Sequence, residues 1–236
     1  LYELKLEAGR KVKLTGAHSI FVLRNDGIKV EKVCNVKEGD YAIIPRSLPE
    51  NDIVKEINLA KELSKTAFYK KIVIAGIPLS LFKEKKNELM HYYKSNYKLP
   101  CQAYYEHKNK RILPIKLYNL IPEHVLRKCK LKTTSPVKIP TYLKVDKELM
   151  RLLGYYIAEG WLTKTGNHYV LSFCLHKDEN EYINEINYCL KKCFSNEAYI
   201  GHISKNSRKL CLNSILVSSV FRDLLKVSRG AKNKEV

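Results

Sequence analysis

The spacing of apolar residues changes in a regular order along the last third of this 236-residue chain. Spacings of three and four residues predict helices, and alternation around turn residues predicts hairpins. The helices are expected at 147–159, 178–194 and 214–225, and the hairpins at 161–175 and 198–213. This α-β-β-α-β-β-α order predicts one compact α+β unit over residues 147–236.

The first fifty residues follow the pattern of a small all-β unit. Apolar and polar residues alternate around Gly9 and on both sides of an Asp26-Gly27 turn. After Pro49 the spacing becomes helical, and one face would carry Ile53, Ile57, Ala60 and Leu63. We therefore divide the chain into residues 1–50, 51–146 and 147–236.

The composition is strongly basic, with 43 lysine and arginine residues against 24 acids and a net charge of +19. Such an excess favours a polyanionic partner, nucleic acid first and an anionic membrane surface second. The longest apolar run, residues 72–82, is interrupted by Pro78 and is too short to span a bilayer. Nucleic acid is therefore the expected partner, and no membrane association is expected.

Seven cysteines are scattered along the sequence without a C-x-x-C pair. Their odd number and wide spacing favour reduced thiols over a disulfide framework or a zinc site. No signal peptide opens the sequence. We therefore expect a cytoplasmic protein.

Residues 83–147 are the most basic part of the chain, with 16 lysines and arginines against five acids. Five tyrosines are interleaved with them: Tyr92, Tyr93, Tyr97, Tyr104 and Tyr105. Such a mixture suits phosphate contacts and base stacking. A solvated basic surface with ordinary core tyrosines would produce the same sequence pattern. Two prolines in residues 132–142 predict an extended linker before the C-terminal unit.

The stretch LLGYYIAEG, residues 152–160, places an acid, Glu159, between Ala158 and Gly160 at the end of an apolar run that also contains Gly154. Gly154 costs a helix about 1 kcal/mol relative to alanine, and its spacing from Ala158 predicts close approach of another helix. Glu159 would lie at the negative end of the helix dipole, so it requires a cation. Lysine, arginine or a divalent metal could serve, and Mg²⁺ shared with substrate oxygens is the simplest choice beside a phosphate-binding sheet.

This stretch resembles the signature of LAGLIDADG (DOD-type) homing endonucleases, with Glu159 at the position of the catalytic acid. The resemblance covers residues 147–236, one half of that α+β fold. It implies a metal-dependent DNA hydrolase, in which two such helices pack together and each places one acid at a metal ion, here Mg²⁺. It also implies that the sheet reads double-stranded DNA, with candidate contacts at Lys164, His168, Lys205, Arg208 and Lys209.

Residues 9–23 are similar to the T-x-x-H block of inteins, matched by Thr15 and His18, and residues 36–49 are similar to the strand and proline-rich exit that follow it. The resemblance implies part of an all-β Hint domain for residues 1–50 and autocatalytic protein splicing in the parent. There, His18 would protonate the scissile amide and Thr15 would add a hydrogen bond. Residues 51–146 would then be a basic linker or an additional DNA-recognition insertion.

The sequence also departs from both families. It opens at Leu1 and ends at Val236 without splice-junction residues, and it holds a single LAGLIDADG helix. Lys234 matches the start of the lysine-containing block between endonuclease halves. We therefore expect an intein fragment, inactive alone, whose partners are DNA, host-protein exteins and a second LAGLIDADG helix from the missing half or another subunit.

Two alternatives stay open at this point. The chain could be a stand-alone single-motif endonuclease that homodimerises through Gly154 and Ala158. It could also be a basic DNA-binding module without catalysis. Measurements of dimerisation and of the effect of Glu159→Gln on DNA cleavage would distinguish the three hypotheses.

Overall fold

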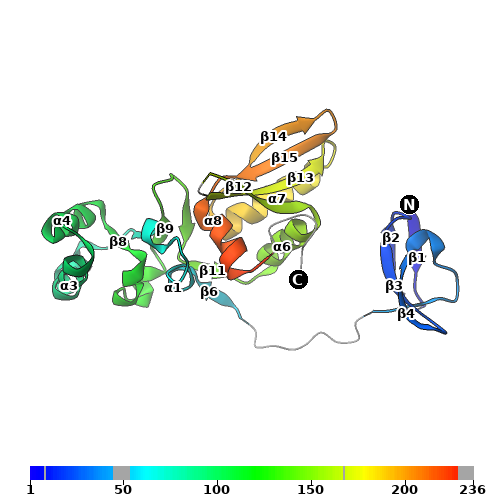
Figure 1. Cartoon of the computed structure of the whole chain (residues 1–236), viewed down its shortest axis with the longest axis horizontal. Coiled ribbons are helices and arrows are strands. Elements are labelled where there is room, and N and C mark those ends of the chain that lie inside the picture. The colour runs from blue at the N-terminus through cyan, green and yellow to red at the C-terminus, as the bar shows by residue number, and fades with distance from the viewer. Residues whose placement is uncertain (8, 45–53, 167, 228–236) are drawn as a thin grey trace. The chain divides into compact units, whose positions relative to one another are not determined.

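The computed structural model describes residues 1–7, 9–44, 54–166 and 168–227. The chain divides into two compact units, Leu1–Ile53 and Val54–Val236 (Figure 1). Residues 54–146, which were expected as a separate segment, belong to the same unit as the C-terminal α+β part. Among the described residues, no helix is both long and apolar enough to cross a lipid bilayer.

The N-terminal unit consists of short antiparallel strands, as the alternating pattern predicts. β1 (Tyr2–Lys5) pairs with β2 (Lys11–Leu14), and β3 (Ser19–Arg24) lies between β4 (Gly27–Lys32) and β5 (Tyr41–Ala42). The β3–β4 turn closes on Gly27, whose φ of +107° is a conformation that glycine adopts easily. One short 3₁₀ turn, η1 (Val33–Asn35), follows β4.

A charged cluster joins the strands of this unit. The guanidinium of Arg24, at the end of β3, donates to both carboxylate oxygens of Asp40 at 3.0 and 2.7 Å and to Glu31 at 3.1 Å. The hydrogen bonds from Arg24, followed by one from the Lys37 backbone, lower the pKa of Asp40 to about 2. The cluster therefore fixes the segment before β5 against the β3–β4 hairpin at neutral pH.

The second unit begins with short strands and helices. They are β6 (Glu56–Asn58), α1 (Leu59–Leu63), η2 (Tyr69–Lys71), β7 (Val73–Ala75), α2 (Leu79–Glu84), α3 (Lys86–Asn96), α4 (Pro100–Lys110), β8 (Ile112–Pro114), η3 (Ile115–Leu120), α5 (Glu123–Leu126), β9 (Lys130–Lys132), β10 (Lys138–Pro140) and β11 (Tyr142–Lys144). Four of these strands form a sheet in the order β10-β9-β7-β8, and β11 pairs with β6.

Two local predictions for this region differ from the structure. From residue 54 on, the helix expected after Pro49 is confined to α1, because Ile57 lies in β6 opposite Leu143 of β11 and Asn58 caps α1 by accepting the N–H of Lys61. Ile53 of the predicted helical face lies outside the described residues. The extended linker expected at residues 132–142 instead supplies β10 and the start of β11. β10 pairs with the neighbouring β9, whereas β11 pairs with the distant β6, so strand pairing determines the local conformation in both regions.

The C-terminal part has the element order that the sequence predicts. It contains α6 (Lys147–Glu159), β12 (Gly160–Thr165), β13 (His168–His176), α7 (Asn180–Phe194), β14 (Tyr199–Ser204), β15 (Ser207–Leu212), α8 (Ile215–Ser219) and a π-helical turn, η4 (Val220–Leu224). The sheet order is β12-β13-β15-β14, all antiparallel. The predicted last helix is therefore divided into α8 and η4.

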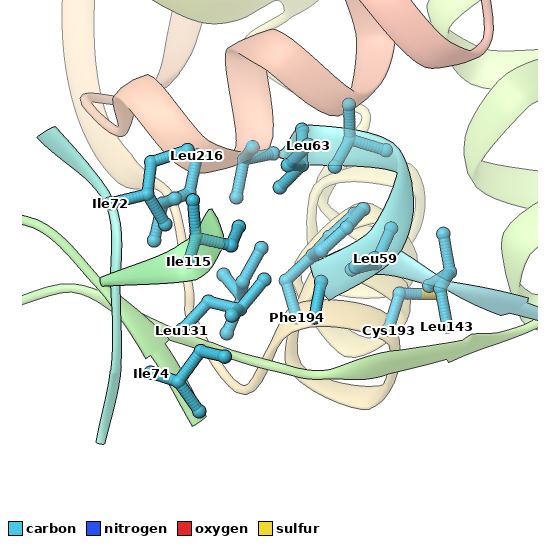
Figure 2. Close-up of a cluster of buried hydrophobic side chains, with 14 of the residues drawn as sticks. Leu59, Leu63, Ile72, Ile74, Ile115, Leu131, Leu143, Cys193, Phe194 and Leu216 are labelled. Atoms are coloured by element: carbon cyan, nitrogen blue, oxygen red, sulfur yellow. The ribbon is translucent and has the colours of Figure 1, made fainter. Parts of the chain in front are cut away.

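One hydrophobic core connects the two parts of the second unit. Figure 2 shows Leu59, Leu63, Ile72 and Leu143 in the same cluster as Phe194 of α7 and Leu216 of α8. All of these side chains are at most 1% exposed. Residues 54–146 are therefore packed against the α+β part rather than tethered to it.

Candidate functional sites

The candidate catalytic acid lies at the end of α6, whose position is set at both ends. Asp146 caps the start of the helix by accepting the N–H of Leu149 at 3.1 Å. The helix buries Leu149, Leu152 and Tyr156, and it ends at Glu159 where Gly160 begins β12. A Cβ at residue 160 would lie 2.6 Å from the Tyr156 Cα, so only glycine permits this abrupt passage from helix to strand.

The opposite face of α6 is open to solvent. Met150, Gly154, Ala158 and Glu159 are exposed, and a Cβ added to Gly154 would meet nothing within 4 Å. The close helix contact predicted from Gly154 and Ala158 is therefore not made within the described part of the chain. Glu159, the last residue of α6, is exposed as well, although it follows the buried Tyr156 by three residues.

The structure supplies one acid at the expected metal position. Within residues 1–7, 9–44, 54–166 and 168–227, no group of three or more His, Cys, Asp and Glu side chains could hold a metal ion. The exposed carboxylate of Glu159 suits Mg²⁺ as one ligand, because this ion takes one or two carboxylates and fills its remaining positions with water and phosphate oxygens.

The five candidate DNA contacts lie at different places on the four-stranded sheet. Because successive side chains of a strand point to opposite faces, Lys209 lies on the face opposite that of the buried Leu210. There its Nζ lies 5.3 Å from the centre of the Trp161 ring. Lys205 is exposed in the β14–β15 turn, and the side chain of His168 lies outside what the structure describes.

Lys164 and Arg208 belong instead to the face that carries the core leucines. Arg208 donates to Asn180 at the start of α7 at 2.6 Å, and its Nε is buried without a hydrogen-bond partner. Lys164 lines a cavity beside Tyr169 and η4. The sequence spacing already indicates this difference. Lys164 and Arg208 each lie two residues from a core leucine, Leu162 and Leu210, and so share its face, whereas Lys209 is adjacent to Leu210 and points to the other face.

The candidate splicing residues Thr15 and His18 are brought together in the turn between β2 and β3. Thr15 Oγ1 lies 3.1 Å from His18 Nδ1, and the His18 N–H donates to the Thr15 carbonyl at 3.1 Å. Both side chains are exposed. A Cβ at Gly16 would lie 2.9 Å from the ring of Tyr2, so glycine allows this turn to pack closely. Lys234 lies outside the described residues.

The tyrosines of the basic region are largely structural. Tyr93 and Tyr104 are buried between α3 and α4, and Tyr104 donates to the Phe82 carbonyl at 2.7 Å. Tyr92 and Tyr97 are half-buried against them. Tyr105 is exposed, with Lys108 Nζ 6.0 Å from its ring centre. The core interpretation therefore accounts for most of this group.

Sequence reasoning missed one arrangement in this unit. The guanidinium of Arg222 lies 4.8 Å from the ring centres of both Phe68 and Tyr169. These three residues come from distant parts of the sequence, and no spacing or motif connects them. Only the tertiary structure brings them together.

No protein-family profile matches the sequence. The whole chain is similar to part of an uncharacterised protein of Methanocaldococcus jannaschii, with 30% identity over 243 residues and 26% of that protein covered. It is also 26% identical over 241 residues to the DNA polymerase II large subunit of Thermococcus kodakarensis, of which it spans 12%. A part amounting to 48% of the chain is 29% identical over 130 residues to transcription initiation factor IIB of M. jannaschii, covering 18% of that protein. The chain thus spans about a quarter or less of each relative.

Proposed function

We propose that this chain is part of an intein that carries a LAGLIDADG homing endonuclease. The observation that carries the proposal is the occurrence of similar segments within proteins of different function. A DNA polymerase subunit and a transcription initiation factor both contain one, and it covers 12% and 18% of their lengths. An inserted element explains this distribution, because the two proteins have no common activity that would require a shared domain of this kind.

The N-terminal unit supports the splicing part of the proposal. The contact between Thr15 Oγ1 and His18 Nδ1 orients the imidazole ring and leaves Nε2 available. In the complete protein, His18 would donate a proton to the nitrogen of the scissile amide, a general-acid role that an imidazole ring can perform.

The open face of the β3–β4–β5 sheet is consistent with an incomplete splicing domain. Its exposed apolar side chains lie opposite one another in the pairing register: Phe21, Leu23, Ile28, Val30 and Tyr41. Exposed apolar surface of this kind is normally covered by another part of a protein. We assign that role to further strands of the parent splicing domain.

The second unit supports the endonuclease part. The uncovered small-residue face of α6 would pack against a second helix of the same kind, from the parent protein or from another subunit. Glu159 would then lie beside the second acid and hold Mg²⁺ together with phosphate oxygens of double-stranded DNA. The metal would supply an activated water and stabilise the charge that develops on phosphate during hydrolysis.

The proposal predicts the effect of one substitution in the complete parent protein. Glu159→Gln keeps the size of the side chain and removes its charge, so metal-dependent DNA cleavage should fall by at least about a hundredfold while DNA affinity is retained. Cleavage of target DNA and binding by gel shift would be measured in parallel.

Glu181→Gln is the matched control, because Glu181 is an exposed acid of the same unit at the start of α7. Cleavage that survives Glu159→Gln at the level of this control would refute the assignment of the catalytic acid.

The exposed α6 face also favours a second candidate, a homodimeric single-motif endonuclease. In that case the chain alone would dimerise, and Gly154→Leu would block dimerisation by filling the space that the partner helix needs. Sedimentation of the wild-type chain as a monomer at all concentrations would exclude this candidate.

A further inference from the structure

A basic cavity lies between residues 54–146 and the α+β part. It is on the face of the β12–β13–β15–β14 sheet that carries the core leucines, not on the face of Lys209. It lies where the chain after α1 meets β12, β13 and η4, and its volume is about 520 Å³. Its lining residues are Ala67, Phe68, Lys71, Lys164, Tyr169, Arg222 and Asp223. Among these residues, only Lys164 was expected to contact DNA, and the cavity itself has no role in the proposed function.

The cavity is built around a fixed arginine. The Arg222 side chain is 9% exposed and stacks between the rings of Phe68 and Tyr169. Its Nε donates to Asp223 at 2.6 Å, so the only carboxylate among the lining residues described here is already paired with an arginine. Stacking and pairing hold these four side chains in one arrangement.

Two lysines at the cavity have no such partner. Lys71 and Lys164 are exposed, and within the described part of the chain neither forms an ion pair. They lie 93 positions apart in the sequence and are brought to one cavity by the core in Figure 2. By contrast, Lys65 in the neighbouring cavity is paired with Glu62 at 2.7 Å.

The ligand that fits this cavity is an anion with several acceptor oxygens. Three cationic side chains face one carboxylate, which leaves two uncompensated positive charges. Lysine ammonium groups bind phosphate as point charges, and the neighbouring aromatic rings offer an apolar surface to an attached sugar.

We propose that Lys71 and Lys164 jointly bind one phosphate of the DNA backbone in this cavity. The inference rests on the proposed function, and it extends the DNA contact from the sheet to residues 54–146. Lys164 then binds DNA from the helix-covered side of the sheet, together with Lys71, which belongs to no sequence motif. Phosphate groups of DNA and of free nucleotides share this chemistry, so the experiment must distinguish them.

The test measures binding of the chain to a mixed-sequence DNA duplex over a range of salt concentrations. Lys71→Gln and Lys164→Gln should each weaken binding several-fold and reduce the slope of log K against log salt by about 1. The double variant should lose little more than either single variant, because both lysines serve the same phosphate.

Lys70→Gln and Lys177→Gln are the matched controls, since both lysines are exposed and neither lines the cavity. Slopes for Lys71→Gln and Lys164→Gln equal to those of the controls would overturn the proposal. Strictly additive losses in the double variant would also overturn it, because they indicate two independent contacts.

Calorimetric titration with inorganic phosphate and with a nucleoside monophosphate separates the two sources of phosphate. Lysine-dependent binding of either anion, without any effect of the variants on DNA affinity, would assign the cavity to a free anion and refute the DNA contact. If the wild-type chain does not bind duplex DNA at all, the proposed function fails. If it binds and the variants match the controls, only this inference fails.

Discussion

At the scale of single residues, the contact between the buried Tyr93 and the half-buried His107 shows how burial affects protonation. The Tyr93 hydroxyl lies 2.7 Å from His107 Nδ1, and Tyr93 is fully buried. Burial lowers the pKa of His107, with a smaller opposing effect from Glu106. The neutral ring is therefore the form that the fold accommodates.

Because the pKa of His107 is lowered in the folded chain, the stability of the fold depends on pH. The unfolded chain binds a proton at its ordinary pKa of about 6.5, above that of the folded chain, so stability is lost as pH falls below this value. The free energy of unfolding of the second unit should therefore decrease from about pH 7.5 to about pH 5.5.

Replacing His107 by Gln should reduce that decrease, as measured by urea denaturation at both pH values. His124→Gln should leave it unchanged, because His124 is exposed. An equal pH dependence in the two variants would show that His107 does not determine it.

At the scale of elements, the glycine inside α6 and the glycine that follows the helix have opposite requirements. Gly154 lies in the helix with open space around its missing Cβ, whereas a Cβ at Gly160 would overlap the backbone of Tyr156. Gly154 thus weakens the helix in the isolated chain, and Gly160 is required for the passage into β12. This difference is in keeping with the proposed packing of a second helix against Gly154.

We predict that Gly154→Ala raises the free energy of unfolding of this chain by about 0.5–1 kcal/mol, because alanine loses less conformational entropy in a helix. Under the proposed function, the same change in the complete parent protein should weaken association of the two helices and reduce cleavage. Thermal unfolding and cleavage assays would test the two effects. Gly160→Ala should instead destabilise the chain, and a destabilising Gly154→Ala would show that the α6 face is already covered.

At the scale of the whole molecule, the shared core makes residues 54–227 one structural unit, with β1–β5 in a separate one. Leu131 of β9 is fully buried and belongs to the cluster in Figure 2, although its strand lies far from α7 in sequence. Truncation of the Leu131 side chain should therefore lower the stability of the whole second unit.

Leu131→Ala should lower the stability of that unit by about 2–5 kcal/mol, the usual range for a large cavity in a core. Hydrogen exchange should show the loss in the slowest amides of both α3–α4 and β13–β15, while β3 and β4 are unaffected. Leu99→Ala is the control, because Leu99 is exposed. A loss confined to residues 54–146 would mean that the two parts of the unit unfold independently.

The sequence alone determined the elements whose signals are local. The hairpin at Gly27, the boundaries of α6 and the order of elements in the C-terminal part follow from turn residues, caps and apolar spacing, all of which act between near neighbours. The proximity of Thr15 and His18 likewise follows from their spacing in one turn.

Only the tertiary structure decided the features that depend on distant residues. Ile57 is a strand residue because it pairs with Leu143, and Arg222 is held between Phe68 and Tyr169. The cavity of Lys71 and Lys164 arises in the same way. Such contacts are selected by the burial of apolar surface across the whole chain, and that free energy is not encoded in any short window of sequence.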